Sequence, residues 1–227
     1  CEKPLSGTEE DVKEMIEACE KAGVVFMEAF AYLHSPLISS IKNALDSGVI
    51  GELSFMESIF VTPSYTPENI RVRRETLGGS VYDLGCYCTS LMLTMFGEEP
   101  KEVRAIGNFT EQHIDDFASA YFQFDENRRA CMVSGMCSAQ RGDRFFLYGT
   151  EGTIEAPVPF NAEGNLVYYI KKENDCKEVH VSTPDNYCLE VEQLGNCILN
   201  GENPHVSHEF SLKNARIVDK ILKEIGY

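Results

Sequence analysis

The sequence predicts an α+β protein built on a large, mainly antiparallel open sheet with helices on one face, preceded by a short α/β unit. Two stretches of different periodicity indicate this fold. Residues 8–30 combine a helical apolar pattern with a short apolar run, as in a parallel α/β fold. Further along the chain, four segments within residues 52–148 alternate with a period of two, which is typical of antiparallel strands. With 43% hydrophobic and 25% charged residues, the chain of 227 residues has enough apolar material for a sizeable core.

Two helices and a strand are expected near the N-terminus. The first helix spans residues 8–22, with acidic residues in its first turn and Gly23 directly after its end. The apolar run 24–30 follows and is typical of a buried strand. A second helix begins at Ser35, a capping serine before a proline, and ends at Gly48.

The remaining elements follow from the alternating stretches and from three further helical patterns. Strands are predicted over residues 52–62, 118–124, 130–138, 144–148, 166–171 and 178–182, and helices over 80–96, 186–199 and 212–225. In the helix at 186–199 the apolar residues Val191, Leu194 and Ile198 are expected to face inward.

The strand at 52–62 carries large apolar residues on both of its sides. Phe55 and Ile59 lie on one side, and Met56 and Phe60 lie on the other. An antiparallel sheet with one face in water needs only one apolar side, so a further layer is expected over the second. We therefore expect a homodimer through the open face of the sheet.

Composition limits the partners and the compartment. Lys and Arg total 20 against 36 Asp and Glu, and the net charge of -16 disfavours nucleic acid and anionic membranes, which bind basic surfaces. No apolar run has the length of a membrane span, and no signal-peptide core is present.

Nine cysteines, an odd number without a CxxC pair, favour buried, reduced thiols in a cytoplasmic protein. The five histidines have no metal-ligand spacing, so no metal site is expected.

The segment 77–87, LGGSVYDLGCY, is the strongest candidate for chemistry. Its paired glycines, Gly78 and Gly79, permit a tight or positive-φ turn. Asp83 and Tyr87 are four residues apart, so on a helix they share one face within hydrogen-bonding reach. A nearby ammonium lowers the pKa of a tyrosine, and Lys, Tyr and Asp together form a site that transfers a proton at a hydroxyl or carbonyl group. The alternative on spacing alone is that Asp83 caps a turn and Tyr87 packs in the core.

Two further features carry charge. Residues 2–4, Glu-Lys-Pro, place a charged pair in a proline turn just before the first helix, although such a tripeptide also occurs by chance. A basic cluster stands out in this acidic chain, although it can also simply neutralise nearby carboxylates; its members are Arg71, Arg73 and Arg74. No GxSxG, P-loop or GxGxxG motif occurs in the sequence.

Taken in order, these motifs resemble the Gfo/Idh/MocA family of NAD(P)-dependent oxidoreductases. The resemblance extends over the whole chain, from EKPL through MEAFAYLHSP, SGVIGEL and GTEGTIEAP to YCLEVEQLGNCILNG. The run GGSVYDLGCYC is its most specific part. It is most similar to the branch that contains dihydrodiol dehydrogenase and xylose dehydrogenase, in which the family's aspartate is followed four residues later by a tyrosine.

The resemblance implies hydride transfer between a nicotinamide, NAD or NADP, and a hydroxyl group of a sugar, diol or polyol. Tyr87 would be the general acid/base for the substrate oxygen, and Asp83 would orient it or bind substrate. The implied catalytic residues are Lys3, Asp83 and Tyr87, the implied cofactor contacts are Glu2, Lys3 and Pro4, and the implied substrate contacts are Arg71, Asp83 and Tyr87.

The family pattern also divides the chain. Residues 1–29 correspond to the C-terminal remnant of a nucleotide-binding Rossmann domain, and residues 30–227 to a substrate-binding and dimerisation domain. Because no GxGxxG motif precedes the first helix, we expect these residues alone to bind no cofactor and to be inactive. The alternative is a non-catalytic dimerising, sugar-binding or regulatory domain of the same fold.

Overall fold

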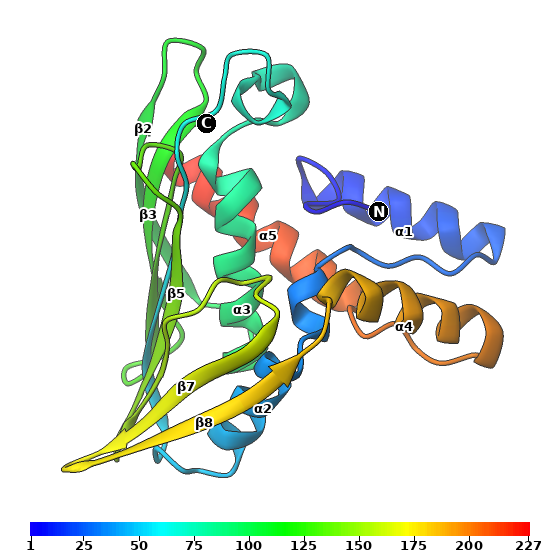
Figure 1. The fold of residues 1–227 in the computed structure, drawn as a ribbon. Helices are drawn as coiled ribbons and strands as arrows, with labels where there is room; N and C mark the ends of the chain where they lie inside the picture. The colour runs from blue at the N-terminus through cyan, green and yellow to red at the C-terminus, as the bar shows by residue number, and fades with distance from the viewer.

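One large sheet with helices along one face dominates the computed structural model, which describes all 227 residues (Figure 1). The eight strands are β1 (Leu53–Val61), β2 (Glu102–Phe109), β3 (Asp115–Gln123), β4 (Arg129–Gly135), β5 (Gly142–Gly149), β6 (Thr153–Ala156), β7 (Gly164–Lys172) and β8 (Asp175–Thr183). Their order is β2-β3-β4-β1-β5-β6-β7-β8. Only β1 and β4 pair in parallel, so the predicted mixed, mainly antiparallel sheet is confirmed.

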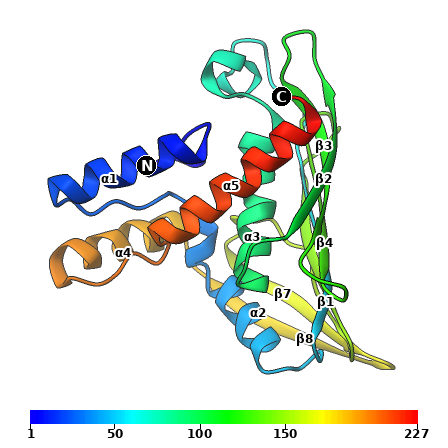
Figure 2. The same ribbon diagram turned by 180° about the vertical axis from the view of Figure 1, so that it is seen from behind.

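The helices lie on the same side of this sheet, as the two opposite views agree (Figures 1 and 2). They are α1 (Glu9–Ala22), α2 (Pro36–Asp46), α3 (Cys86–Phe96), α4 (Asn186–Asn200) and α5 (His208–Ile225). Each corresponds to a predicted helix. The predicted first and last residues of two helices are confirmed. Ser35 caps the N-terminus of α2, and Gly23 ends α1 in the left-handed region at φ 66°.

The core forms where the helix-facing side chains of the sheet meet α2, α3 and α5. Met56 and Phe60 of β1 are buried there, as are Phe122 of β3 and Phe145 of β5. Because strand side chains alternate between faces, the other register of β1, which includes Phe55, stays half-buried on the bare face. Strand β2 was not predicted, because small residues, Ala105 and Gly107, occupy two of its helix-facing positions, while Ile106 between them is exposed.

The strand predicted at residues 24–30 is wrong for this structure. Only Ala29 makes a β-bridge, a single parallel one with Glu2, and Val24 and Val25 are exposed. A strand exists only where a neighbouring segment receives its backbone hydrogen bonds, and here the sole neighbour is the short N-terminal segment, whose Cys1 carbonyl accepts from the Ala29 N–H.

The inward orientation predicted for the apolar face of α4 is also wrong. Val191 is 68% and Ile198 62% exposed, while Leu194 packs partly against the core. Helices α4 and α1 project away from the sheet beyond the core-forming helices (Figures 1 and 2). The exposed side of α4 therefore has no partner among these residues.

Helix α1 is held to the rest of the fold through α5. Leu5, Val12 and Ile16 form a small buried cluster against Leu212 and Ala215 of α5, separate from the main core. The guanidinium of Arg216 on α5 adds hydrogen bonds to Glu9 at the start of α1 and to Glu99 before β2. These contacts fix the turn that precedes α1 relative to the sheet.

The cysteines are all free, in agreement with the prediction of reduced thiols. The expectation that they are buried holds for Cys86, Cys88 and Cys197, but it is wrong for Cys1, Cys137, Cys176 and Cys188, which are exposed. No three His, Cys, Asp or Glu side chains lie close enough together to hold a metal ion. None of the helices has the length and apolar character needed to cross a membrane.

Candidate active site

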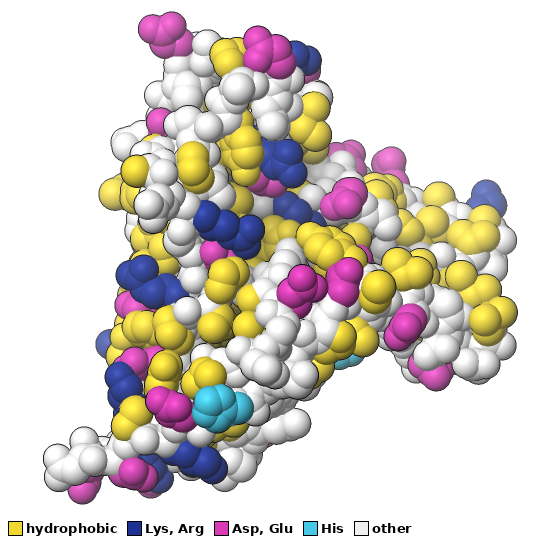
Figure 3. Space-filling view, in the orientation of Figure 1, with side chains coloured by type: hydrophobic (Ala, Val, Ile, Leu, Met, Phe, Trp, Pro, Cys, Tyr) yellow, Lys and Arg dark blue, Asp and Glu magenta, His cyan; other side chains and the backbone are white.

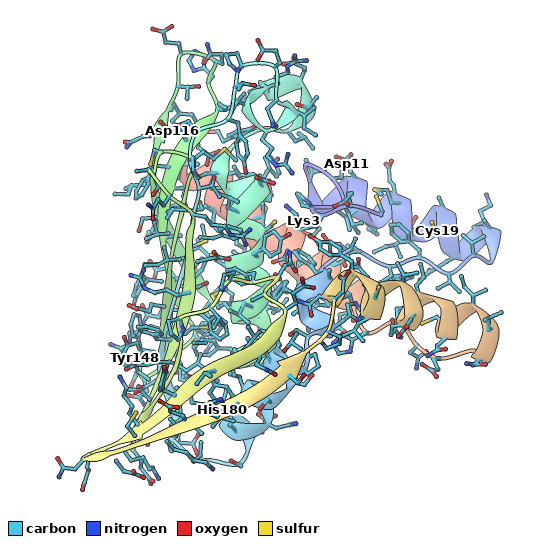
Figure 4. The ribbon with its side chains drawn as sticks, viewed as in Figure 1. Lys3, Asp11, Cys19, Asp116, Tyr148 and His180 are labelled. Carbon is cyan, nitrogen blue, oxygen red and sulfur yellow. The ribbon has the colours of Figure 1, made fainter.

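Lys3, Asp83 and Tyr87 meet at one side of a cleft, although Lys3 and Asp83 are 80 residues apart in the chain. Lys3 lies where the segment before α1 approaches α3 and the sheet (Figure 4). Its Nζ donates to the Asp83 carbonyl oxygen at 2.7 Å and lies 3.2 Å from Asp83 Oδ1. The same atom is 4.7 Å from the centroid of the Tyr87 ring, a cation–π distance. The fold thus brings together the three residues that the resemblance implied as catalytic.

Arg71 completes the charge arrangement around Asp83. Its Nε donates to Asp83 Oδ2 at 3.0 Å, so one carboxylate is shared by Lys3 and Arg71. The other arginines of the basic cluster lie outside this cleft. Arg74 packs over the Tyr227 ring at 3.9 Å and donates to the His113 carbonyl oxygen, a structural contact.

The paired glycines set the entry into the helix that carries Asp83 and Tyr87. Their N–H groups donate to the carbonyl oxygens of Arg73 and Arg71, which folds the preceding loop back on itself. A Cβ on Gly78 would lie 2.6 Å from the Arg73 oxygen. Gly79 has φ +127° and its Cβ would lie 2.1 Å from Asp115 Oδ1. The expected positive-φ turn is therefore confirmed, and no other residue fits at Gly79.

Asp115 anchors the first turn of this helix from the sheet. It is fully buried, and its Oδ2 accepts from the Ser80 hydroxyl at 2.7 Å and from the Val81 N–H at 2.8 Å. Burial raises the pKa of this carboxyl to about 6, although these hydrogen bonds lower it. The turn that leads to Asp83 is thereby fixed to β3.

The helix begins with a π-helical turn, Val81–Gly85, before the α-helical α3. The wider turn changes the relative orientation of the Asp83 and Tyr87 side chains from that in a regular α-helix. The two side chains make no hydrogen bond with each other, so the expected direct contact is wrong. Both contact Lys3 instead, and the ammonium links them.

Burial dominates the proton affinity of Tyr87. It raises the pKa of the phenol to about 12, because it outweighs the lowering by the Lys3 ammonium. The expected net lowering is therefore wrong, although the contribution of Lys3 has the expected sign. For Lys3, burial lowers the pKa, but Cys86, Tyr87 and Asp83 together raise it more, so the net shift is upward. At neutral pH the site holds a neutral phenol beside an ammonium.

The cleft has a volume of about 480 Å³ and includes residues that the sequence did not single out. The predicted residues Glu2, Lys3, Pro4, Arg71, Asp83 and Tyr87 all line it. So do Phe60, Thr62, Tyr65, Arg141, Asn161, Tyr187 and Glu190, which come from β1, from loops and from α4. No local motif marks these positions, because they converge only when the strands pair and α4 folds back.

A buried carboxyl group, that of Glu28, lies next to the Glu-Lys-Pro turn and accepts a hydrogen bond from the residue after it. Glu28 is 3% exposed, and its Oε1 accepts from the Leu5 N–H at 3.2 Å. Its other oxygen has no hydrogen-bond partner. Burial raises the pKa of Glu28 to about 7, although the Ser211 hydroxyl, the Leu5 N–H and the nearby Lys3 lower it.

Comparison with known proteins identifies the family. Residues 38–155 match the GFO/IDH/MocA C-terminal domain. The chain belongs to the GFO/IDH/MocA family. It is 32% identical to a trans-1,2-dihydrobenzene-1,2-diol dehydrogenase of Xenopus laevis, with 100% of this chain and 70% of the relative covered. It is 26% identical to a D-xylose 1-dehydrogenase (NADP(+)) of Haloferax volcanii, with 97% of this chain and 68% of the relative covered.

Two solved structures share this architecture. A 3-ketoreductase from Actinomadura kijaniata, solved with NADP and TDP-benzene, superposes with a TM-score of 0.93 at 22% identity, covering 99% of this chain and 70% of that one. An aldose-aldose oxidoreductase from Caulobacter crescentus, solved with glycerol, gives a TM-score of 0.89 at 23% identity, with 99% and 68% covered. The fold that the resemblance implied is thereby confirmed.

Proposed function

We propose that this chain supplies the substrate-binding and proton-transfer side of an NAD(P)-dependent oxidoreductase acting on a sugar, diol or polyol. One observation carries the proposal. Lys3, in the turn before α1, contacts both Asp83 and Tyr87. A proton donor, Tyr87, and an ion pair, Lys3 with Asp83, therefore line the same cleft. The named dehydrogenases among the relatives support the same reaction class.

Tyr87 is the proton donor in the direction of reduction. The nicotinamide, when bound, supplies the hydride to the carbonyl carbon. The carbonyl oxygen takes the phenolic proton of Tyr87, so the carbonyl becomes an alcohol and the phenol becomes a phenolate. The Lys3 ammonium stabilises that phenolate, and Asp83 holds the ammonium in position. Oxidation of the alcohol follows the same proton path in reverse.

Glu2, Lys3 and Pro4 fit the nicotinamide end of the cofactor. They border the cleft together with Ala29, so an apolar wall lies beside an ammonium whose charge Asp83 balances. Such a wall suits a flat, amphipathic ring. We assign only the nicotinamide end of the cofactor to residues of this chain.

Tyr87→Phe in the full-length enzyme tests the proposal. Loss of the general acid should lower kcat by roughly 10² to 10⁴, measured by the absorbance of reduced nicotinamide, while substrate binding persists. Tyr148→Phe, a half-buried tyrosine on the bare face of the sheet, is the matched control. Wild-type turnover by the Tyr87 variant would remove it from the mechanism. Sugar binding by the wild type without any turnover would favour the non-catalytic alternative.

We also propose that residues 1–29 form part of a nucleotide-binding domain and residues 30–227 the substrate domain. Hydrophobic side chains gather on the projection formed by α1 and α4 (Figure 3). Its exposed apolar residues are Val24, Val25, Tyr187, Val191, Ile198 and Leu199. Contiguous apolar surface of this kind marks an interface, and it includes the start of the segment 24–28, which belongs to no strand. In the full-length protein this surface should be protected from hydrogen exchange, and exchange as fast as in open loops would contradict the boundary.

A homodimer through the bare face of the sheet is our proposal for assembly. That face carries Phe55, Ile59 and Tyr148, with Phe55 and Tyr148 stacked at 5.3 Å between ring centroids. Ile106 on β2 is 75% exposed. Sedimentation should show a dimer that Ile106→Glu or Ile59→Asp weakens. A wild-type monomer at all concentrations would refute this assembly.

A further inference from the structure

The loop between β1 and the helix of Asp83 and Tyr87, residues 62–79, has open space on both of its sides. One side lines the cleft of about 480 Å³ and includes Arg71. The other side, which includes Arg74, lines a second cavity of about 380 Å³ against the connection between β2 and β3. Because space lies on both sides, the position of the loop depends strongly on a few specific contacts.

Three hydrogen bonds attach residues 65–78 to parts of the chain outside the loop. Two of them, described above, are donated by Arg71 and Arg74. The third comes from the turn after α5, which lies beside the loop in both views (Figures 1 and 2). There the Tyr227 hydroxyl donates to the Gly78 carbonyl oxygen at 2.7 Å. Tyr227 therefore holds the part of the loop that folds back on Arg71.

The end of α5 gives Tyr227 a fixed position. Gly226 ends the helix in the left-handed region at φ 83°, and the Tyr227 N–H donates to the Leu222 carbonyl oxygen at 2.9 Å. Tyr227 is half-buried, and it is not among the residues that line the cleft. An effect of this residue on the reaction must therefore pass through its neighbours.

The Tyr227 ring contacts two residues that lead to the site. The guanidinium of Arg74 lies over the ring, 3.9 Å from its centroid, which is a cation–π distance. Tyr82 packs edge to face against the same ring, with centroids 5.3 Å apart. The Tyr82 hydroxyl donates to the Gly7 carbonyl oxygen at 2.9 Å, in the segment that also carries Lys3. Tyr227 thus lies between the loop and that segment.

Both connections end at the carboxylate of Asp83. Arg71 binds its Oδ2 and Lys3 its Oδ1, so that the two cations fix the plane of the carboxylate from opposite oxygens. The ammonium of Lys3 lies 4.7 Å from the centroid of the Tyr87 ring and lowers the pKa of that phenol, in opposition to burial. A displaced Arg71 would free Asp83 to turn and would weaken the contact of Lys3 with Tyr87.

We propose that Tyr227 is a positioning residue, whose hydroxyl holds the loop 62–79 so that Arg71 orients Asp83 and thereby Lys3. This inference rests on the proposed function, because it takes Tyr87 and Lys3 as the groups that transfer and stabilise the proton. It also gives Arg74 of the basic cluster a role, since its contact with the ring keeps Tyr227 against the loop.

Tyr227→Phe in the full-length enzyme tests the proposal, because it removes the hydroxyl and keeps the ring. It should lower kcat roughly five- to tenfold, the value of one hydrogen bond. The rise of alcohol oxidation with pH should also shift to higher pH, because the Tyr87 phenolate loses part of its stabilisation by Lys3. A hydroxyl that only stabilises the fold would not move this pH profile. Tyr121→Phe, a tyrosine 39% exposed on β3, is the matched control and should change neither quantity.

A double-mutant cycle identifies the path. In an Arg71→Met background, Tyr227→Phe should lower kcat no further, because the guanidinium through which the hydroxyl acts is gone. Losses that multiply in the double variant, or a pH profile that does not shift in Tyr227→Phe, would overturn the inference.

Amide hydrogen exchange separates this inference from the proposed function, because it needs no turnover. Amides of residues 65–79 should exchange roughly five- to tenfold faster in Tyr227→Phe than in the wild type, while the central strands stay protected. Unchanged exchange in the loop would overturn the inference even if Tyr87 is essential for turnover. Faster exchange in the loop would support the hold of Tyr227 on it even if Tyr87→Phe turns over normally, and in that case the proposed reaction fails.

Discussion

Glu28→Gln should make the stability of this fold less dependent on pH. Glu28 lies under the Glu-Lys-Pro turn, 3% exposed, with one oxygen unpaired. Burial raises the pKa of its carboxyl from the ordinary 4.5 to about 7. The folded state therefore binds this proton more tightly than the unfolded state, and folding is penalised wherever the carboxyl must ionise.

The sign and size follow from that shift. The contribution of Glu28 to stability is fully present below pH 4.5 and is lost as the pH rises through about 7. For a single site with these two pKa values, raising the pH from about 5 to about 8 lowers the free energy of unfolding by roughly 2.5 kcal/mol. Glutamine stays neutral throughout and keeps the oxygen that accepts from the Leu5 N–H, so the variant loses this dependence.

Urea unfolding followed by circular dichroism at the two pH values measures the effect. The stability of Glu28→Gln relative to the wild type should rise by about the amount calculated above between the lower and the higher pH. Other buried carboxyls, such as Asp115, act equally in both proteins and cancel. Glu17→Gln, an exposed glutamate on α1, is the control and should give no such change. Parallel pH dependences for wild type and Glu28→Gln would refute the reasoning.

Three further substitutions test the packing. Gly79→Ala should destabilise the fold by about 2 kcal/mol or more, because φ is +127° and the new Cβ lies 2.1 Å from Asp115 Oδ1. Gly201→Ala, at φ +72° with nothing within 4 Å, should cost only about 1 kcal/mol in the same urea titration, and equal costs would argue against the close approach. Phe124→Ala, at a fully buried core position, should cost about 3 to 5 kcal/mol, and a smaller loss would mean that the core collapses around the cavity. Arg216→Ala should speed amide exchange in α1 while leaving the central strands protected; uniform changes would show that α1 and the sheet unfold together.

The sequence was sufficient where a local pattern decides the structure. Capping residues and apolar spacing located the five helices, and alternation located all strands of the sheet except β2 and the short β6, for which it indicated only a successor to β5. The same sequence placed Lys3, Asp83 and Tyr87 among the candidates, because each stands in a motif that is readable along the chain. It failed for residues 24–30 and for the apolar face of α4, where an apolar pattern does not say whether a partner is present.

Tertiary structure alone decided the environment of the site. The sequence determined that a lysine, an aspartate and a tyrosine are available, but only the fold sets Lys3 between the other two and buries Tyr87 deeply enough to raise its pKa to about 12. The partners of Asp83 and the cleft that Phe60, Asn161 and Glu190 line likewise exist only once distant strands and α4 converge. Periodicity is a property of neighbours in the chain, whereas desolvation and hydrogen-bond satisfaction depend on neighbours in space.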